Sequence, residues 1–218
     1  MLSEVQIMTE NIDVFGHNSI CIRSEKGPVY VDPFRIKEAA NDAAYIFITH
    51  DHYDHFSPED IDKVIGRDTI LVVPEKMSDK AKTVSGKFAK VVTVASGQSY
   101  EADGLEFETV AAYNTMKPFH MKSAGWVGYI IHDNGKKIYV AGDTDATAEV
   151  KAVKCDVALV PIGGVYTMDA KKAAEVINEM KPAVAIPVHY GSIVGSPKDA
   201  EEFATLVKEP VKVEIRIR

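Results

Sequence analysis

The sequence predicts an α+β domain in which two β-sheets are packed between outer layers of helices. Its 218 residues are enough for one domain with a full core and too few for two of ordinary size, so we expect a single domain over residues 1–218. Many short apolar segments are typical of strands, and the helix-forming segments between them are fewer. This pattern appears in both halves of the chain, which indicates two sheets between helix layers.

Strands separated by turns are expected through the first part of the chain. Gly16 and Gly27-Pro28 interrupt the early strands, as glycine and proline do at turns. A helix is expected over residues 58–65, because Ser57 suits its cap and proline suits its first position. Another short helix is expected to begin at residues 74–75. The expected strands are residues 5–9, 12–15, 19–23, 29–31, 43–48 and 69–73.

The rest of the chain adds further strands and two clearer helices. Asn134-Gly135 separates two strands as a tight hairpin turn does. Residues 170–180 are rich in helix formers, and Asp169 is suited to cap their first turn. A last helix is expected from Asp199 onward. The expected strands are residues 91–95, 105–112, 127–131, 138–141, 157–161, 184–188 and, at a sheet edge, 211–217.

Composition narrows the class of protein. The net charge of −7 argues against a broad nucleic-acid-binding surface, which needs clustered Lys and Arg. No apolar run is long enough to span a bilayer, and residues 1–7 lack the pattern of a signal peptide. We therefore expect a cytoplasmic protein with a small-molecule substrate and no membrane partner, and a homo-oligomer is compatible with the sequence. Cys21 and Cys155 are expected to be buried thiols rather than a disulfide.

The segment Thr-His-Asp-His-Tyr-Asp-His at residues 49–55 contains three of the seven histidines of the chain. Imidazole nitrogen and carboxylate oxygen suit zinc and related transition metals, so the candidate ligands are His50, His52, Asp54 and His55. Four ligands on one short loop cannot all bind one ion without strain, but they can serve two adjacent ions. The loop lies between an apolar strand and a helix start, which favours a rigid metal site over a histidine-rich surface loop.

Two further strand ends offer ligands that could complete such a site. Gly142-Asp143-Thr144 follows an apolar strand, and its glycine lets the backbone approach closely beside the Asp143 carboxylate. His189 likewise follows an apolar strand and precedes a glycine turn. A bridging carboxylate and another histidine from elsewhere in the fold are what a two-ion site needs.

The motifs T-H-x-H-x-D-H at residues 49–55 and G-D-T at 142–144, followed by His189, resemble those of the metallo-β-lactamase-fold hydrolase superfamily, in the same order. The resemblance covers essentially the whole chain. It implies a four-layer αββα sandwich of two mixed β-sheets flanked by helices, with a dinuclear site at the edge of the sheets. By position, His50 and His52 would bind the first ion and Asp54 and His55 the second. Asp143 would bridge the two ions, and His189 would complete the second site.

The third histidine of the first ion departs from the family pattern. Many relatives have a histidine after the strand that ends near Ala112, where this chain has Tyr113-Asn114. An amide oxygen from Asn114 is a poor ligand for a transition metal, so we expect His120 to take this place. His132 also lies in the second half of the chain, at a strand end, and is expected to be exposed to solvent.

Several other residues are expected near the ions or the substrate. Gly16-His17-Asn18-Ser19 resembles the Gly-His-x-Ser segment of a lactonase-like cytoplasmic subgroup, in which the histidine lies near the metal site; a histidine in a turn is the alternative. Asp32 matches the family's Asp-Pro, whose carboxylate orients a ligand histidine, although a turn residue before proline is equally natural. Asp145 could touch an ion, but it is expected instead to cap a helix at 146–150. Tyr166 and Thr167 could offer hydroxyls to a substrate or simply form a turn.

The resemblance implies a metal-dependent hydrolase. Two divalent ions, zinc above all with manganese or iron as alternatives, would activate a hydroxide that attacks a small ester, lactone or phosphodiester. Asp54 and Asp143 would then be catalytic as ion ligands. The sequence contains no nucleophile elbow and no phosphate-binding P-loop that would supply a rival mechanism. An iron-containing redox protein and a non-catalytic, metal-stabilised binding protein are the alternatives from other functional classes.

Overall fold

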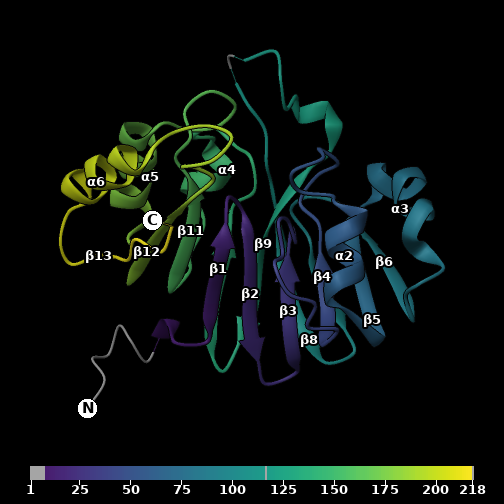
Figure 1. Cartoon of the computed structure of the whole chain (residues 1–218). Helices are drawn as coiled ribbons and strands as arrows, with labels where there is room; N and C mark the ends of the chain where they lie inside the picture. Colours follow the sequence, from purple (N-terminus) through teal and green to yellow (C-terminus); the bar gives the residue numbers. More distant parts are fainter. Residues whose placement is uncertain (1–7, 116, 218) are drawn as a thin grey trace.

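The computed structural model describes residues 8–115 and 117–217, and it contains two β-sheets packed face to face (Figure 1). The first sheet has the order β1 (Ile12–Gly16), β2 (Ser19–Ser24), β3 (Gly27–Val31), β4 (Ala43–Phe47), β5 (Ile65–Pro74) and β6 (Lys90–Val94). The second has the order β13 (Lys212–Val213), β12 (Val184–Val188), β11 (Val157–Pro161), β10 (Lys136–Val140), β9 (Val127–Asp133), β8 (Leu105–Ala111) and β7 (Ser99–Ala102).

Both sheets are mixed, and they are built in the same way. In the first sheet β1, β2 and β3 pair antiparallel, and the pairs from β3 to β6 are parallel. In the second sheet β7 to β10 pair antiparallel, and the pairs from β10 to β13 are parallel. Parallel strands present their carboxyl ends at one edge of a sheet, and ligands bind at that edge in open α/β sheets. The predicted metal-binding motifs follow β4, β10 and β12.

Helices cover the outer face of each sheet (Figure 1). On the first sheet these are α2 (Pro58–Val64), the 3₁₀ turn η1 (Glu75–Met77) and α3 (Ser78–Ser85). On the second they are α4 (Ala148–Lys151), α5 (Ala170–Met180) and α6 (Pro197–Leu206). A second 3₁₀ turn, η2 (Lys122–Ala124), lies in the long segment between β8 and β9. The four-layer αββα sandwich expected from the sequence is therefore confirmed.

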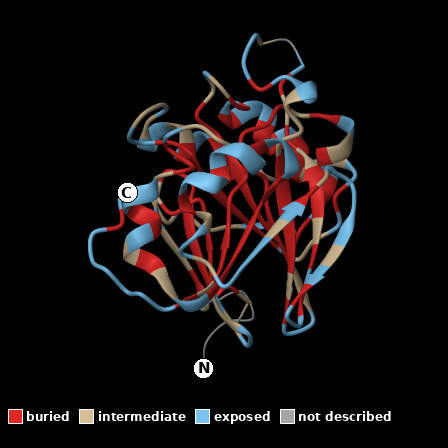
Figure 2. Ribbon diagram, turned by 90° about the vertical axis from the view of Figure 1, so that its right-hand side faces the viewer, coloured by how far each residue is buried: buried red, intermediate tan, exposed pale blue. Residues whose placement is uncertain are grey.

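The strands are apolar on both faces because each face is covered. In β4, Tyr45 and Phe47 point into the core between the sheets, while Ile46 packs under the helices of the outer layer. Phe47 meets Phe107 and Tyr129 edge to face, with ring centroids 4.9 Å apart in both pairs. Figure 2 shows buried strands inside a shell of helices whose outward surfaces are exposed. This alternation explains the nearly continuous apolar runs of the central strands.

Some expected elements differ from the structure. Residues 5–7 of the first expected strand lie outside the described residues, and Met8 and Thr9 are helical. β7 was not expected, because most of this edge strand is exposed and it lacks an apolar run. The expected strand at 211–217 pairs only over Lys212–Val213, beyond which Arg216 donates to the Thr9 carbonyl oxygen at 3.0 Å. The helix expected from Asp199 begins at Pro197, and the Asp199 carboxylate accepts from the Ser196 backbone N–H.

Both cysteines are free thiols. Cys21 is buried beneath the helices of the first sheet. Cys155 is only partly buried and packs beside Met180 on the outer face of the second sheet. The two thiols thus lie on opposite sides of the sandwich, as expected for unpaired cysteines, although the expectation of full burial was wrong for Cys155. Among the described residues, every helix is too short or too polar to cross a membrane.

Candidate metal centre

The predicted ligands come together in two adjacent groups at one edge of the sandwich. His50, His52 and His120 form the first group, and within it one nitrogen atom from each ring lies within 4.8 Å of the others. The second group, under the same limit, consists of His17, Asp54, His55 and His189. Residues that are up to 172 positions apart in the chain therefore meet in space. The structure brings together all seven residues that the sequence suggested as ligands, Asp143 included.

The first group consists of three imidazole rings that lie close together. Its ring centroids lie 4.7 Å apart for His50 and His52, 4.8 Å for His52 and His120, and 5.1 Å for His50 and His120. The Nε2 atoms of His50 and His120 are buried and accept or donate no hydrogen bond. Trp126 closes the group, with its ring about 5 Å from all three imidazoles. Two nitrogen atoms of this group are thus left free for a ligand that the chain does not provide.

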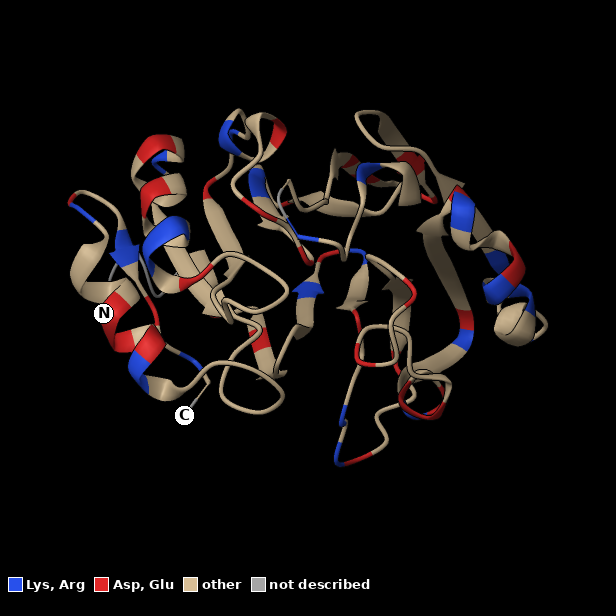
Figure 3. Ribbon diagram, turned by 90° about the horizontal axis from the view of Figure 1, so that it is seen from above, with Lys and Arg blue, Asp and Glu red and all other residues tan. Residues whose placement is uncertain are grey.

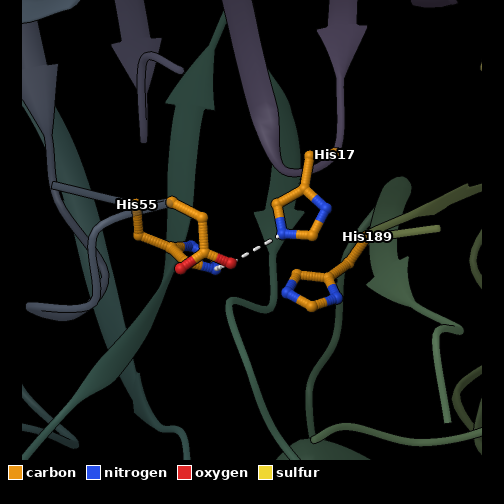
Figure 4. A group of neighbouring side chains, drawn as sticks. His17, His55 and His189 are labelled. Atoms are coloured by element: carbon orange, nitrogen blue, oxygen red, sulfur yellow. Dashed lines mark hydrogen bonds and ion pairs between the residues drawn. The ribbon is translucent and has the colours of Figure 1, made fainter. Parts of the chain in front are cut away.

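The second group joins turns from both sheets (Figure 4). His17 follows β1, and its ring lies 3.8 Å from that of His189, which follows β12. The backbone N–H of His189 donates to the His17 carbonyl oxygen at 2.7 Å, so that the two turns are held together. His17 Nε2 lies 2.9 Å from Asp54 Oδ2, and the ring of His55 stacks 5.3 Å from that of His189. His17 therefore touches two of the predicted ligands.

Asp143 lies between the two groups. Its Oδ1 atom is 3.0 Å from His189 Nε2 and 3.3 Å from His55 Nε2, on the side of the second group. Its Oδ2 atom is 3.4 Å from His120 Nε2 and 3.9 Å from His50 Nε2, on the side of the first. One carboxylate oxygen thus faces each group, which is the placement of a bridging ligand.

Gly142 allows Asp143 to reach this place. Its φ of +64° is a left-handed conformation, which glycine adopts without steric cost. A Cβ atom at this position would lie 3.0–3.3 Å from three side-chain atoms of Thr49. The G-D-T turn therefore packs directly against the start of the histidine loop, and a larger residue would push the two segments apart.

Buried hydrogen bonds fix which nitrogen of each ring is free. Asp32 is fully buried, and its Oδ2 atom accepts from His55 Nδ1 at 2.7 Å and from the Thr49 hydroxyl at 2.6 Å. Because the Thr49 hydroxyl has only one hydrogen, which it donates to Asp32, its contact with His50 Nδ1 at 2.9 Å requires His50 to donate. The Nε2 atoms of His50 and His55 are therefore left unprotonated when the rings are neutral, in the form that binds metal. The carboxylate of Asp32 thus orients the ring of His55, which is the role expected from the Asp-Pro motif.

The electrostatics suit a cation. Burial lowers the pKa of His50 well below its ordinary value and that of His120 to about 4, so these rings are neutral at neutral pH. Burial opposes ionisation of Asp143, but the facing rings of His189 and His55 prevail and hold its pKa well below the usual range. For His55, burial acts downward, yet the carboxylates of Asp143 and Asp32 raise its pKa to about 9. An ion at His55 Nε2 would thus displace a proton.

Four residues of the centre adopt a left-handed backbone. The φ values are +52° for His17, +47° for Asp32 and +58° for both His120 and His189. Such a conformation costs a non-glycine residue about 1–3 kcal/mol and persists only where the surrounding structure enforces it. Backbone strain of this kind collects at functional sites, and here it directs side chains from four separate turns toward one centre.

The loop between β8 and β9 carries His120 and explains the role of Asn114. The backbone N–H of Asn114 donates to the His120 carbonyl oxygen at 2.7 Å, which closes the loop. The Asn114 amide lies 3.4 Å from His120 Nδ1 and donates to the Tyr166 carbonyl oxygen at 2.8 Å. Asn114 is therefore on the far side of the ring from Nε2, the atom that faces Asp143. The geometry favours His120 over Asn114 as the third ligand of the first group.

Asp145 does not cap the following helix, contrary to expectation. Thr147 does so, since its hydroxyl accepts from the Val150 N–H at 3.2 Å. The buried Asp145 carboxylate instead accepts from the Thr115 N–H at 3.1 Å and pairs with Lys117 Nζ at 3.1 Å. Lys117 also donates to the Thr167 carbonyl oxygen. The loop that carries His120 is thus tied to the segment that carries Asp143, and no sequence signal pointed to Lys117.

A pocket of about 300 Å³ opens beside the two groups. Tyr166 lines it as expected, but Thr167 does not, because its buried hydroxyl donates to the Met168 carbonyl oxygen at 3.1 Å. His132 lies outside the centre, half-buried beside Glu108. A larger hollow of about 620 Å³ over β8 and α4 contains none of the candidate ligands. The smaller pocket is lined by His52, Tyr53, Asp54, Phe119, His120, Asp143, Tyr166 and Ile193.

Known proteins share this sequence and fold. Residues 11–189 match the model of the beta-lactamase superfamily domain. The chain is 32% identical to a UPF0173 metal-dependent hydrolase of Pyrococcus abyssi, over 93% of this chain and 94% of the relative. A relative of the same name from Thermoplasma acidophilum is 30% identical, over 90% and 91% of the two chains.

Solved structures agree. A protein of Parabacteroides distasonis superposes with a TM-score of 0.77 at 27% identity, over 95% of this chain and 93% of that chain. The fold is shared as well by Igni18, a metallo hydrolase of Ignicoccus hospitalis, with a TM-score of 0.72 at 23% identity over 95% of each chain. The order of the motifs, the αββα layers and these matches lead to one assignment. The chain belongs to the beta-lactamase superfamily and, within it, to the UPF0173 metal-dependent hydrolases.

Proposed function

We propose that this hydrolase works with two divalent metal ions and cleaves a small ester or lactone. His50, His52 and His120 would hold one ion, and Asp54, His55 and His189 the other, with Asp143 between them. The observation that carries the proposal is the carboxylate of Asp143, each of whose oxygen atoms faces a different group of buried imidazoles.

The unpartnered atoms of the centre support a fit to two ions. The Nε2 atoms of His50, His55, His120 and His189 and Oδ1 of Asp143 are all buried without a hydrogen bond. Leaving one polar atom buried and unpaired costs about 1–3 kcal/mol, so that several together in one place need a common partner. A mixed set of nitrogen and carboxylate ligands suits zinc, with manganese and iron as alternatives.

The residues of this chain have distinct tasks in the proposed reaction. Two divalent ions lower the pKa of water from ~15.7 toward ~7 and so supply a nucleophile at neutral pH. Asp32 and Thr49 orient the rings of His55 and His50, and His17 holds the Asp54 carboxylate in place. Phe119 and Tyr166 line the pocket beside the candidate ligands, where the substrate would bind.

The non-catalytic alternative rested on a first group that lacked its third ligand. His120 lies within that group, next to His50 and His52, so this reason no longer applies. Nothing in the described residues favours the redox alternative over hydrolysis.

The test is metal content paired with turnover. We expect purified full-length protein, loaded with zinc or manganese, to retain about two equivalents and to hydrolyse methyl or aryl esters. Asp143→Ala should lose metal and turnover together. His132→Ala is the matched control, because this histidine pairs with Glu108 outside the centre and should change neither. Full turnover by Asp143→Ala would contradict the proposal, as would wild-type protein that retains two ions without hydrolysing any ester or lactone.

A further inference from the structure

We propose that the pocket selects an uncharged substrate that carries a flat apolar group beside the cleaved bond, such as an ester of an arylacetic acid. This inference rests on the proposed hydrolysis and names the substrate class. It comes from the pocket residues other than the candidate ligands, which are Tyr53, Phe119, Tyr166 and Ile193.

These four side chains form an aromatic and aliphatic wall. Phe119 and Tyr166 meet edge to face, with ring centroids 5.4 Å apart and an interplanar angle of 84°. They come from different segments, because Phe119 lies between β8 and β9 and Tyr166 between β11 and α5. In Figure 1 the teal segment between β8 and β9 rises above the edge of the sandwich. The wall is therefore assembled by the tertiary fold around the metal centre.

Two of these rings are exposed to solvent. Tyr53 is 67% exposed and Phe119 is 51% exposed, and both border the same pocket. A single exposed apolar residue needs no explanation, but grouped ones mark a binding surface. Aromatic rings pack well against another flat ring, either stacked or edge to face. An aryl group of the substrate would pack against the Phe119–Tyr166 pair, with Tyr53 at the border of the same pocket.

The pocket contains no permanently charged basic side chain that would pair with an anion. Among the described residues, none of those lining the pocket is a lysine or an arginine. Lys117 and Lys122, which flank the segment with Phe119 and His120, are bound to Asp145 and Glu149. Along the peripheral helices, basic and acidic residues are interspersed, as Figure 3 shows.

The charge of two ions would be largely offset within the centre itself. Asp32, Asp54 and Asp143 place three carboxylates around the imidazoles. The chain as a whole carries a net charge of −7, which repels anions at long range. Recognition of a phosphate group typically uses arginine or lysine, and neither lines this pocket. The balance favours a neutral ester or lactone over a phosphodiester.

Three methyl esters with the same leaving group test the proposal. They are methyl acetate, methyl phenylacetate and methyl 4-carboxyphenylacetate, assayed with the metal-loaded full-length protein. We expect kcat/KM for methyl phenylacetate to exceed that of each of the others at least tenfold. Phe119→Ala and Tyr166→Ala should each reduce the preference for the phenyl ester about tenfold through KM, while metal content stays at the wild-type value. His132→Ala should leave the preference unchanged.

The outcomes separate this inference from the proposed function. If the esters are hydrolysed without preference for the phenyl group, or if the carboxylated ester or bis(p-nitrophenyl) phosphate is preferred, the inference is wrong and hydrolysis stands. If no ester is hydrolysed, binding of phenylacetamide decides. It is read from the fluorescence of Trp126, the single tryptophan, which lies beside His52 and His120. Binding that is weakened in Tyr166→Ala supports the pocket alone, and absence of binding overturns both proposals.

Discussion

Replacing Lys117 with methionine removes the counter-charge of a buried carboxylate and keeps an unbranched side chain of similar length. The Asp145 side chain is 5% exposed and that of Lys117 is 22% exposed, so water cannot readily substitute for the ammonium group. Removing one partner of a buried ion pair costs about 3–5 kcal/mol, because the other charge is left uncompensated. Since Lys117 is partly exposed, we expect a loss near the lower limit, about 3 kcal/mol, in the free energy of unfolding.

The same substitution should weaken the first ion site and leave the second intact. Lys117 and Thr115 attach the His120 loop to the segment of Asp143 through the Asp145 carboxylate. Loss of a residue that supports a metal ligand typically reduces metal affinity 10–100-fold. We expect a decrease of about tenfold, which is about 1.4 kcal/mol, for the ion held by His50, His52 and His120.

Competition with a chelator measures this effect. Metal equivalents should fall from about two to about one at a chelator concentration that leaves the wild-type protein fully loaded. Trp126 fluorescence reports the change locally, because its ring contacts the three histidines of the first group. Lys117→Arg, which keeps the charge, should restore most of the loss. If Lys117→Met binds each of the two ions as tightly as the wild-type protein does, the reasoning is refuted.

Two further outcomes follow from buried groups. Asp32→Asn should reduce retention of the second ion 10–100-fold in metal analysis, because it removes the negative charge and one of the two acceptor oxygens that orient His55 and Thr49. The control is Asp133→Asn, which changes a buried aspartate that accepts from Asn11 and Glu25 and should retain both ions. Burial raises the pKa of Cys21 and of Cys155 to about 12. At pH 8 the buried Cys21 should therefore react with a disulfide reagent only after unfolding, and the partly buried Cys155 should react slowly. Because these pKa values are raised, the contribution of the two thiols to the free energy of unfolding is present below about pH 8.5 and is lost as the pH rises toward 12. Rapid labelling of both thiols in folded protein at pH 8 would contradict this account.

The sequence predicts those ligands of the centre that lie together on one loop or directly follow an apolar strand. His50, His52, Asp54 and His55 lie on one loop, and Asp143 and His189 each follow a strand that is apolar enough to recognise. Parallel pairing of these strands places their carboxyl ends at a common edge of the sheet. The apolar periodicity of the strands is enough to suggest this arrangement from the sequence.

Other parts of the centre depend on tertiary contacts, which no local sequence pattern predicts. Lys117 and Asp145 are 28 residues apart, and neither lies in a recognisable motif. Asp145 resembled a helix cap because aspartate and threonine both cap helices, and Thr147 stood two positions later. Thr167 resembled a pocket residue, but the turn after β11 directs its hydroxyl to a backbone carbonyl. The left-handed backbone of His120 is likewise imposed by its surroundings.

Anomalous scattering at the zinc edge, from crystals of zinc-loaded protein, tests the two-ion centre most directly. The account predicts two peaks about 3.5–4 Å apart, the usual spacing in two-metal sites. One should lie among His50, His52 and His120 and the other among Asp54, His55 and His189, with the carboxylate of Asp143 between them. A single peak, or two peaks that do not share Asp143, would contradict it.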